Sequence, residues 1–416
     1  MILVVIGYII VGVLVTVSLW GLYNLPILAT GIKDYCKKRQ KSRIEVSTEK
    51  YTPTFSIIVP AKNEGNVISR LLTALSKLNY PPQKTEIIVV EDGSTDNTAS
   101  LCMDFAKEHK NVSILQRTVS NGKPSALNYA LAHATGDIVA VFDADNVPDP
   151  DALTTVCEYF KEPEVAAVQG RTSSINAKQN MLTQFISYEE AVWCEAYLRG
   201  KDVLNLFVHL KGSCQFIRRD ILTKLKGFSE AVLSEDMEMS ARLTENNYKI
   251  RYASDVVSLQ ESPSDWKTLF KQRTRWNRGT MQVALRYGRL MANPSLKRFD
   301  AEATLFGPFI LIATLLPYIG MLWTFFQVVP FDALWQAAVQ FATITSALTL
   351  LLAGLAIVYV NKPRSKRNIL WLPFVYVYWS MQALIALYAA LLILLRRPSK
   401  WTKTEKRGSD DSTRKI

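Results

Sequence analysis

Two aspartates, one residue apart, follow a short apolar stretch in the first half of the chain. The stretch is Ile138–Phe142, and several of its residues are β-branched, which is typical of a buried strand. Asp143 and Asp145 come directly after it. Ligands of open α/β sheets bind outside the carboxyl ends of the strands. Carboxylates there suit Mg²⁺ or Mn²⁺ that carries a substrate's phosphates. An ordinary polar loop is the alternative.

A further carboxylate, Asp92, follows the apolar run 86–90, which is also a predicted strand. With Gly93 behind it, a turn would place a carboxylate and free backbone amides near a nucleotide. Ser94 and Asp96 precede a predicted helix, so capping of that helix is the alternative. Acidic residues also open the predicted helix 234–246, where capping is again the simpler explanation.

A basic and aromatic motif lies on a later predicted helix. Residues at positions i, i+3 and i+4 share one helical face, so Gln272, Arg275 and Trp276 point together. An Arg there can pair with a diphosphate, and a Trp can stack on a sugar ring. A membrane-anchoring amphipathic helix is the alternative. We expect the first face to look into a site, and a second face to look at lipid. The second face comprises Trp266, Leu269, Phe270 and Arg273.

The segments that position these groups alternate between strand and helix patterns from residue 54 to residue 170. The predicted strands are 55–60, 86–90, 112–115, 138–142 and 165–169, and the predicted helices are 64–78, 96–109, 123–134 and 150–161. This alternation predicts βαβ units and a mainly parallel sheet. Helices are also predicted over 180–200, 234–246 and 264–293, with a loop entering a strand at 211–218.

Four apolar segments are each long enough to span a membrane: 2–30, 304–328, 335–360 and 369–395. The first could be a signal peptide, but its amino end lacks basic residues and its apolar run is too long. The net charge of +12 gathers beside these segments, in 33–43, 362–367 and 396–407. This placement favours anionic lipid over nucleic acid as the partner.

The charge pattern places the domain after the first span in the cytosol of a multi-pass plasma-membrane protein. If all four segments cross, the basic tail ends outside, which contradicts its charge. Pro373 interrupts the last segment, so we expect a re-entrant or kinked pair of short helices and a cytosolic tail. Residues 406–416 have the composition of a disordered segment.

Taken together, the motifs resemble family 2 glycosyltransferases of the GT-A fold over about residues 54–280. Those motifs are Pro60-x-x-Asn63-Glu64, Glu91-Asp92-Gly93-Ser94-x-Asp96, Gly122-Lys123-x-x-Ala126-Leu127-Asn128, Asp143-Ala144-Asp145, Ser234-Glu235-Asp236 and Gln272-x-x-Arg275-Trp276. The membrane-embedded branch, with cellulose, hyaluronan, chitin and poly-N-acetylglucosamine synthases, is similar. Two departures are mild: Ser234 stands where the family often has Thr, and Glu91 where it has Asp.

The resemblance implies a role for each matched residue. Asp236 would be the catalytic base, and Asp143 and Asp145 would hold Mg²⁺ or Mn²⁺. Glu235 and Trp276 would bind the acceptor. The donor nucleotide and diphosphate would be bound by Glu64, Glu91, Asp92, Lys123, Asp143, Asp145, Gln272 and Arg275. This agrees with the chemistry, because a leaving diphosphate needs neutralisation by metal and Arg, and the acceptor hydroxyl needs a base. One base without a protein nucleophile implies inversion.

The implied activity is transfer from a UDP-sugar to the hydroxyl of a growing polysaccharide by a processive β-glycan synthase. The alternative acceptor is a lipid: a diacylglycerol, ceramide or polyprenyl phosphate. The complete acidic set argues against a non-enzymatic protein with a decayed nucleotide domain. Four spans are few for a pore, so a homo-oligomer or an export partner would be needed for a polymer. We expect an anchor at 1–32, a basic linker at 33–53, a catalytic domain at 54–262, interfacial helices at 263–303, transmembrane segments at 304–395 and a basic tail at 396–416.

Overall fold

The computed structural model describes residues 2–38, 51–287, 290–316, 333–360, 366–398 and 403–408. Its centre is one mixed sheet in the order β3-β2-β1-β4-β7-β6-β8-β5. The strands are β1 Phe55–Ala61, β2 Thr85–Asp92, β3 Val112–Arg117, β4 Ile138–Val141, β5 Val147–Pro148, β6 Val165–Ser174, β7 Gln215–Arg218 and β8 Lys249–Gln260. The pairs β1–β2, β2–β3, β1–β4 and β6–β8 are parallel, whereas β7 is antiparallel to both of its neighbours. The predicted mainly parallel sheet is confirmed.

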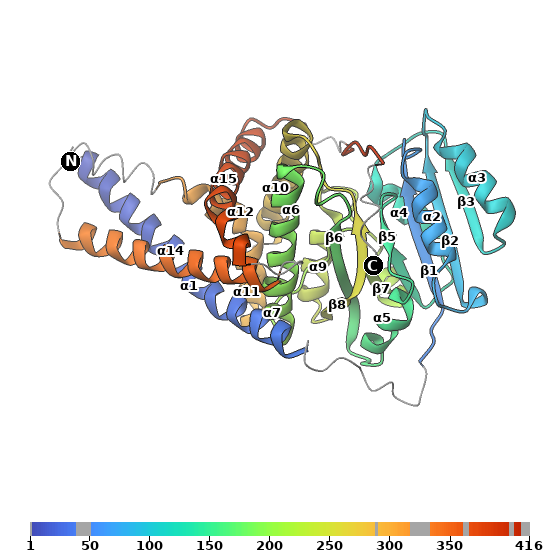
Figure 1. Ribbon diagram of the computed structural model, residues 1–416, viewed down its shortest axis with the longest axis horizontal. Helices are drawn as coiled ribbons and strands as arrows, with labels where there is room; N and C mark the ends of the chain where they lie inside the picture. The colour runs from blue at the N-terminus through green and yellow to red at the C-terminus, as the bar shows by residue number, and fades with distance from the viewer. Residues whose placement is uncertain are drawn as a thin grey trace.

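Helices cover both faces of this sheet (Figure 1). One face packs on α2 (Ile68–Ser76), α3 (Thr98–Glu108) and α5 (Ala152–Phe160). The other packs on α4 (Lys123–Leu131), α8 (Arg219–Lys224) and α9 (Glu235–Glu245). Strand β1 contributes buried side chains to both layers, because successive side chains point to opposite faces of a strand. Ile57 is thus buried in the first layer and Ile58 in the second. Each such side chain contributes about 1.5–3 kcal/mol by its burial.

A helical layer lies between this sheet and the apolar helices. It contains α6 (Met181–Val192), a π-helical turn (Trp193–Leu198), α7 (Arg199–Val203) and α10 (Trp266–Tyr287). Helices α11 (Leu296–Leu305) and α12 (Gly307–Ala313) follow. The helices predicted near 180–200 and 264–293 are confirmed. Strand β8 was not predicted from the sequence, which suggested no strand between residues 247 and 263.

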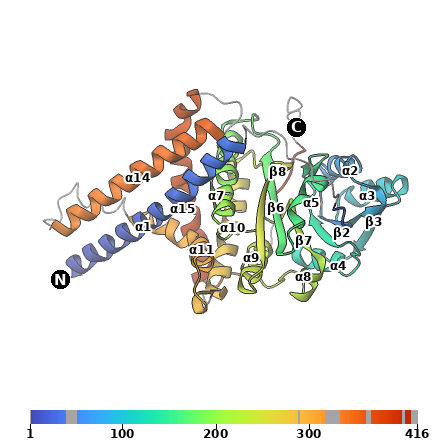
Figure 2. The ribbon, with the colours of Figure 1, turned by 90° about the horizontal axis from the view of Figure 1, so that it is seen from below.

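Three helices in the described residues are long and apolar enough to cross a membrane: α1 (Ile2–Lys38), α14 (Ala333–Val360) and α15 (Leu372–Leu394). Helices α1 and α14 lie side by side in Figures 1 and 2. Their early turns pack together through Ile10, Leu14, Trp335 and Ala338. The Tyr35 hydroxyl near the end of α1 donates to the Val360 carbonyl at the end of α14, at 3.3 Å. The two helices therefore run in the same direction. Of the predicted span 304–328, residues 317–328 lie outside the described residues.

The prediction for Pro373 was wrong. Pro373 lies in the first turn of α15, where its missing N–H costs no hydrogen bond and its fixed φ suits a helix start. The proline therefore begins one continuous helix and does not divide it. Helix α15 packs along α10, with Met281 of α10 against Ala386 and Ala389.

Candidate active site

Lys123, at the first turn of α4, joins three segments that the sequence separates widely. Its Nζ lies 2.6 Å from Asp143 Oδ1, just after β4, and donates to the Gly212 carbonyl at 2.8 Å. Glu235 Oε1, at the start of α9, is 3.6 Å from the same nitrogen. The fold thus brings Lys123, Asp143 and Glu235 together from separate helices and strand ends.

Asp236 completes this cluster through a close approach to the backbone of Gly212. Gly212 has φ +78°, and a Cβ built on it would lie 3.1 Å from Asp236 Oδ2 and 3.2 Å from Lys123 Nζ. A side chain at this position would be strained and would press on both charged groups. Glycine therefore lets the Asp236 carboxylate and the Lys123 ammonium lie against the same loop.

Burial dominates the electrostatics of the cluster. It raises the pKa of Asp236 to about 7, with a further increase from the negative charge of Glu235 and an opposing effect of Lys123. Burial also works against the charged form of Lys123, but Asp143 and Glu235 outweigh it and raise the pKa of this ammonium. The cluster therefore pairs a permanently charged lysine with a carboxylate that can take up a proton near neutral pH.

Helix α10 closes one side of the cluster. Gly279 packs against Ser234, the residue before α9, so the two segments touch without an intervening side chain. Burial lowers the pKa of Arg275, and the nearby carboxylates of Glu235, Asp143 and Asp236 oppose this shift. Trp276, the next residue, is 39% exposed, and the Arg273 guanidinium lies 4.5 Å from its ring centre. An exposed aromatic ring thus directly follows Arg275 in α10 and lies against Arg273.

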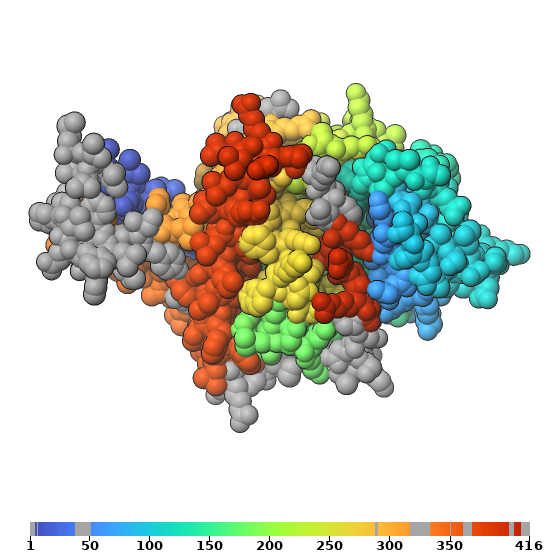
Figure 3. All heavy atoms as spheres, turned by 90° about the horizontal axis from the view of Figure 1, so that it is seen from above, coloured from blue at the N-terminus to red at the C-terminus, as the bar shows by residue number. Residues whose placement is uncertain are grey.

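Asp145 is buried beside the cluster and already faces a cation. Its Oδ2 accepts the Glu261 backbone N–H at 2.9 Å and lies 2.6 Å from Nζ of Lys406. Lys406 belongs to the segment 403–408, which Figure 3 shows in dark red between the blue and the yellow parts of the molecule. Burial alone would raise the pKa of Asp145, but Lys406 holds it below its usual value.

Asp143 and Asp145 fit a divalent metal ion by the chemistry of their oxygens. Within the described ranges, no group of three or more His, Cys, Asp or Glu side chains could hold a metal alone. Two carboxylates with phosphate and water as the remaining ligands are the usual arrangement for Mg²⁺. The Lys406 ammonium already contacts Asp145 Oδ2, so this oxygen is placed to bind a cation.

Two further carboxylates that the sequence singled out lie at the end of β2. The Ser120 hydroxyl donates to Asp92 at 2.5 Å, and Arg117 Nε lies 3.3 Å from the same carboxylate. Glu91 accepts the Ser94 backbone N–H at 2.6 Å, which fixes the turn at Gly93 (φ +68°). Both carboxylates are buried, so the protein holds them in place at the edge of the sheet.

Residues 53–279 match the family model described as "Glycosyltransferase like family 2". The chain belongs to this family. It is 32% identical over 270 residues to the probable glycosyltransferase YdaM of Bacillus subtilis, over 64% of each chain. It is also 32% identical over 271 residues to a β-monoglucosyldiacylglycerol synthase of Nostoc sp. (64% of this chain, 55% of the relative). A poly-β-1,6-N-acetyl-D-glucosamine synthase of Staphylococcus epidermidis is 29% identical over 253 residues, 60% of each chain.

The match therefore covers less than two thirds of the length of each of these relatives. Among solved structures, the mannosyltransferase PcManGT of Pyrobaculum calidifontis, in complex with GDP-Man and Mn²⁺, has a TM-score of 0.58 at 22% identity. This likeness covers 94% of the present chain and all of that one. The predicted GT-A fold is thereby confirmed.

The structure brings together several of the residues that the sequence suggested for a glycosyltransferase site. Lys123, Asp143, Glu235, Asp236 and Arg275 form one cluster, and Glu91 and Asp92 are buried at the end of β2, which β1 separates from β4 in the sheet. Glu64 and Asp145 both contact lysines of the segment 403–408. Gln272 is half-buried on α10, one turn before Trp276.

Sequence reasoning missed four participants: Gly212, Ser213, Glu261 and Lys406. Ser213 Oγ accepts the Asp143 backbone N–H at 3.0 Å and donates to Asn146. Glu261 directly follows β8, so recognition of that strand would have drawn attention to it. Nothing in the sequence indicates that Lys406 contacts Asp145. The disorder expected for residues 406–416 was wrong for residues 406–408, which the structure describes.

The expectation that the second face of α10 looks at lipid was wrong for Leu269 and Arg273, and for Trp266 and Phe270 it stays a prediction. Leu269 is fully buried against α6 and α15, and Arg273 pairs with Glu189 of α6. Trp266 and Phe270 are partly exposed, but their rings lie 6.3 and 5.3 Å from Tyr378 and Tyr388 of α15. The apolar helix α15 thus covers part of this face and leaves the Trp266 and Phe270 rings exposed.

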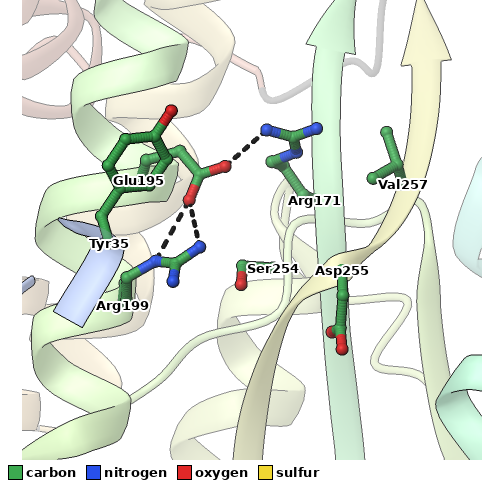
Figure 4. Close-up of a pocket in the computed structure, with 7 residues that line it drawn as sticks. All are labelled: Tyr35, Arg171, Glu195, Arg199, Ser254, Asp255 and Val257. Carbon is green, nitrogen blue, oxygen red and sulfur yellow. Dashed lines mark hydrogen bonds and ion pairs between the residues drawn. The ribbon is translucent and has the colours of Figure 1, made fainter. Parts of the chain in front are cut away.

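A cavity of about 280 Å³ lies at the end of α1, and none of the residues that line it belongs to the acidic cluster (Figure 4). Glu195, in the π-helical turn, lies between the guanidinium groups of Arg171 and Arg199. Arg199 also pairs with Asp34 of α1 at 3.2 Å. These ion pairs attach the end of α1 to the catalytic domain.

Proposed function

We propose that this glycosyltransferase moves a sugar from a UDP-sugar to the hydroxyl of a growing polysaccharide at the membrane, with inversion of the anomeric carbon. The observation that carries the proposal is the buried Asp236, whose pKa is raised to about 7 beside Lys123, Arg275 and the acidic strand ends. A general base works best when its pKa is close to the operating pH.

In this proposal Asp236 accepts the proton of the acceptor hydroxyl as its oxygen attacks the anomeric carbon. A single displacement of this kind inverts the configuration, and the UDP leaves with the bonding electron pair. Lys123 and Arg275 lie where positive charge would stabilise the departing diphosphate. Asp143 and Asp145 would hold Mg²⁺ or Mn²⁺, which would supply further neutralisation of the diphosphate when bound. Glu64, Glu91, Asp92 and Gln272 would complete the donor site.

The half-exposed Trp276 supports a glycan acceptor. Its ring is 39% exposed and offers an apolar face of the kind on which a sugar ring can stack, and it follows Arg275 directly in α10. With Glu235 it would bind the terminal sugar of the acceptor. We further propose that the catalytic domain is cytosolic and that the chain is a multi-pass plasma-membrane protein. A homo-oligomer or an export partner would then carry the polymer outward.

A lipid acceptor is the second candidate. Several β-monoglucosyldiacylglycerol synthases are 30–32% identical to this chain, which is comparable to the polymer synthases. The packing of α10 on the apolar α15 also supports it, because this contact brings the acceptor side close to the membrane.

The test is the identity of the product. Purified protein would be given radiolabelled UDP-glucose, UDP-N-acetylglucosamine and UDP-glucuronate, each with Mg²⁺ or Mn²⁺. We expect a labelled polymer that chloroform–methanol does not extract. An extractable glycolipid would establish the second candidate instead. Asp236→Asn should abolish transfer while UDP-sugar binding stays near normal. Loss of donor binding would place Asp236 in the donor site and contradict its role as the base.

The metal has its own test. Asp145→Asn keeps the shape of the side chain but removes the charge, so transfer should fall by about two orders of magnitude or more, the scale of removing one stabilising group. EDTA should abolish the activity of the unmodified enzyme, and added Mn²⁺ should restore it. Full activity in EDTA would remove the metal from the mechanism.

A further inference from the structure

Residues 403–408, close to the end of the chain, lie across the proposed donor site (Figure 3). They border a cavity of about 610 Å³ together with Asn63 and Asn66, which follow β1. Lys403 pairs with Glu64 at 3.1 Å and donates to the Asn63 carbonyl. This short tail segment therefore contacts a loop more than 300 residues earlier in the chain.

Glu261 and Asn66 hold the backbone of the tail segment. The Glu261 carboxylate accepts the backbone N–H groups of Arg407 at 2.9 Å and of Gly408 at 3.0 Å. Asn66 donates to the Lys406 carbonyl at 3.2 Å. Gly408 has φ +72°, and a Cβ there would lie 2.7 Å from the Asn66 carbonyl. The site thus recognises the backbone path of the tail as well as its charges.

Lys406 reaches furthest into the site. Its ammonium lies 2.6 Å from Asp145 Oδ2 and donates to the Glu261 carbonyl at 2.7 Å. Asp145 Oδ2 also accepts the Glu261 N–H, so both of its lone pairs are engaged. A divalent ion bound to this oxygen at about 2.1 Å would overlap with the ammonium and would be repelled by its positive charge. The lysine and a metal ion therefore cannot both occupy Oδ2 of Asp145.

We propose that the segment 403–408 is an intramolecular occupant of the donor site, in which the Lys406 ammonium holds the seat of the divalent ion until the metal and nucleotide displace it. The inference rests on the proposed metal-binding role of Asp143 and Asp145. It makes the resting enzyme self-inhibited, and arrival of the donor with its metal releases the tail.

The first test measures Mn²⁺ binding to the full-length protein by electron paramagnetic resonance, without nucleotide. If the tail is docked in about nine molecules of ten, it weakens the apparent affinity about tenfold. Lys406→Ala should therefore lower the Kd for Mn²⁺ about tenfold. Lys110→Ala, which removes an exposed lysine after α3, is the charge-matched control and should leave it unchanged. Asp145→Asn should abolish binding.

The second test follows the tail itself by limited trypsin cleavage after Lys403 and Arg407. Glu261→Gln should speed cleavage, because it loosens the backbone clamp, and Mn²⁺ with UDP should do the same to the unmodified protein. Protection of the tail by Mn²⁺ and UDP would show a lid that closes over the donor, and would overturn the inference.

The outcomes separate the inference from the proposed function. If Asp145→Asn loses Mn²⁺ binding but Lys406→Ala changes nothing, the metal site stands and the tail inference falls. If Asp145→Asn binds Mn²⁺ normally, the metal ion binds elsewhere. The proposed metal site at Asp145 and the tail inference are then both wrong.

Discussion

Asp236 is subject to opposing influences within a single helical turn. It lies at the start of α9, where the helix dipole favours a negative charge. Burial and the neighbouring Glu235 nevertheless prevail and raise its pKa to about 7. Since the dipole contributes only about 0.3–1 kcal/mol at exposed positions, strong desolvation can exceed it. A carboxylate that is poorly solvated and close to another is well suited to accept a proton.

The pH dependence of transfer should report this pKa. Below about pH 7 Asp236 is protonated and cannot act as the base, so kcat/KM should fall about tenfold for each further pH unit. Above pH 7 the carboxylate is free and the rate should level off. The measurement is kcat/KM from pH 5 to pH 9 at saturating metal.

Glu235→Gln provides the matched control for this prediction. It removes the nearest negative charge but keeps the size of the side chain, so the pKa of Asp236 should drop and the acid limb should move to lower pH. An acid limb near pH 4 in the unmodified enzyme, or one that Glu235→Gln leaves in place, would contradict the role of Asp236.

At the scale of elements, the sequence could predict the strands whose residues are buried on both faces. Strands β1, β2 and β4 read as apolar runs because helices cover both sides of the sheet. Strand β8 could not be recognised in the same way, since Lys249, Arg251 and Asp255 interrupt its apolar residues. These charges are satisfied by tertiary contacts, such as the Arg251–Asp202 pair at 2.9 Å, which the local sequence does not reveal.

The two faces of α10 show the same limit. Helical spacing places Arg275 and Trp276 apart from Trp266 and Phe270, but it cannot say what each face meets, and the Trp276 ring in fact lies against Arg273 of the second face. The second face meets α15, because two apolar surfaces gain by mutual burial. The proposed acceptor-binding face and the packing face thus belong to one helix, and substitutions can tell them apart.

Trp276→Ala should therefore reduce transfer more than stability. Loss of a stacking surface for the acceptor should cost about tenfold or more in kcat/KM, equivalent to about 1.4 kcal/mol. Loss of the cation–π contact with Arg273 should cost about 0.5–1 kcal/mol of stability. Trp276→Phe should retain part of the activity. Transfer and Tm would be measured on the same purified samples.

Trp266→Ala is the control on the other face of α10. Its ring packs near Tyr378 of α15, so the variant should melt earlier while turnover per folded molecule stays close to normal. Equal losses of Tm for both variants, with no selective loss of transfer at Trp276, would reduce the motif to a packing helix.

At the scale of the whole molecule, the two ends of α15 lie on the catalytic domain. The Trp371 ring, just before α15, packs 5.9 Å from Phe185 of α6. Past the other end, the Pro398 carbonyl accepts a hydrogen bond from Arg278 of α10 at 3.1 Å. Within α15 itself, the exposed residues are apolar or aromatic, among them Phe374, Val377, Leu384 and Leu391. We therefore expect α15 to lie along the membrane surface and not to cross it.

This arrangement removes the conflict that the apolar segments alone create. Four crossings would put the basic tail outside, but the tail segment 403–408 docks on Asp145 and Glu261 of the catalytic domain. Hydropathy reports only that a segment is apolar, and it cannot distinguish a helix that crosses the bilayer from one that packs on a domain beside it. The long-range contacts of the tail supply the missing information.

The tail and the catalytic domain should consequently be labelled from the same side of the membrane. Cys36, which is exposed, would first be replaced by Ser, and the buried Cys102, Cys157, Cys194 and Cys214 would be kept. In this background Glu405→Cys marks the tail and Lys110→Cys marks the catalytic domain, both at exposed positions. Intact and permeabilised cells would then be treated with a membrane-impermeant maleimide.

With a cytosolic catalytic domain, both cysteines should react only after permeabilisation. Reaction of Glu405→Cys in intact cells, with Lys110→Cys protected, would mean that α15 crosses the membrane and that the tail cannot reach Asp145. Reaction of both cysteines in intact cells would reverse the orientation of the whole protein, yet keep the tail beside the catalytic domain. The comparison of the two sites thus tests the contact between tail and domain separately from the direction of insertion, because that contact requires only that both lie on one side.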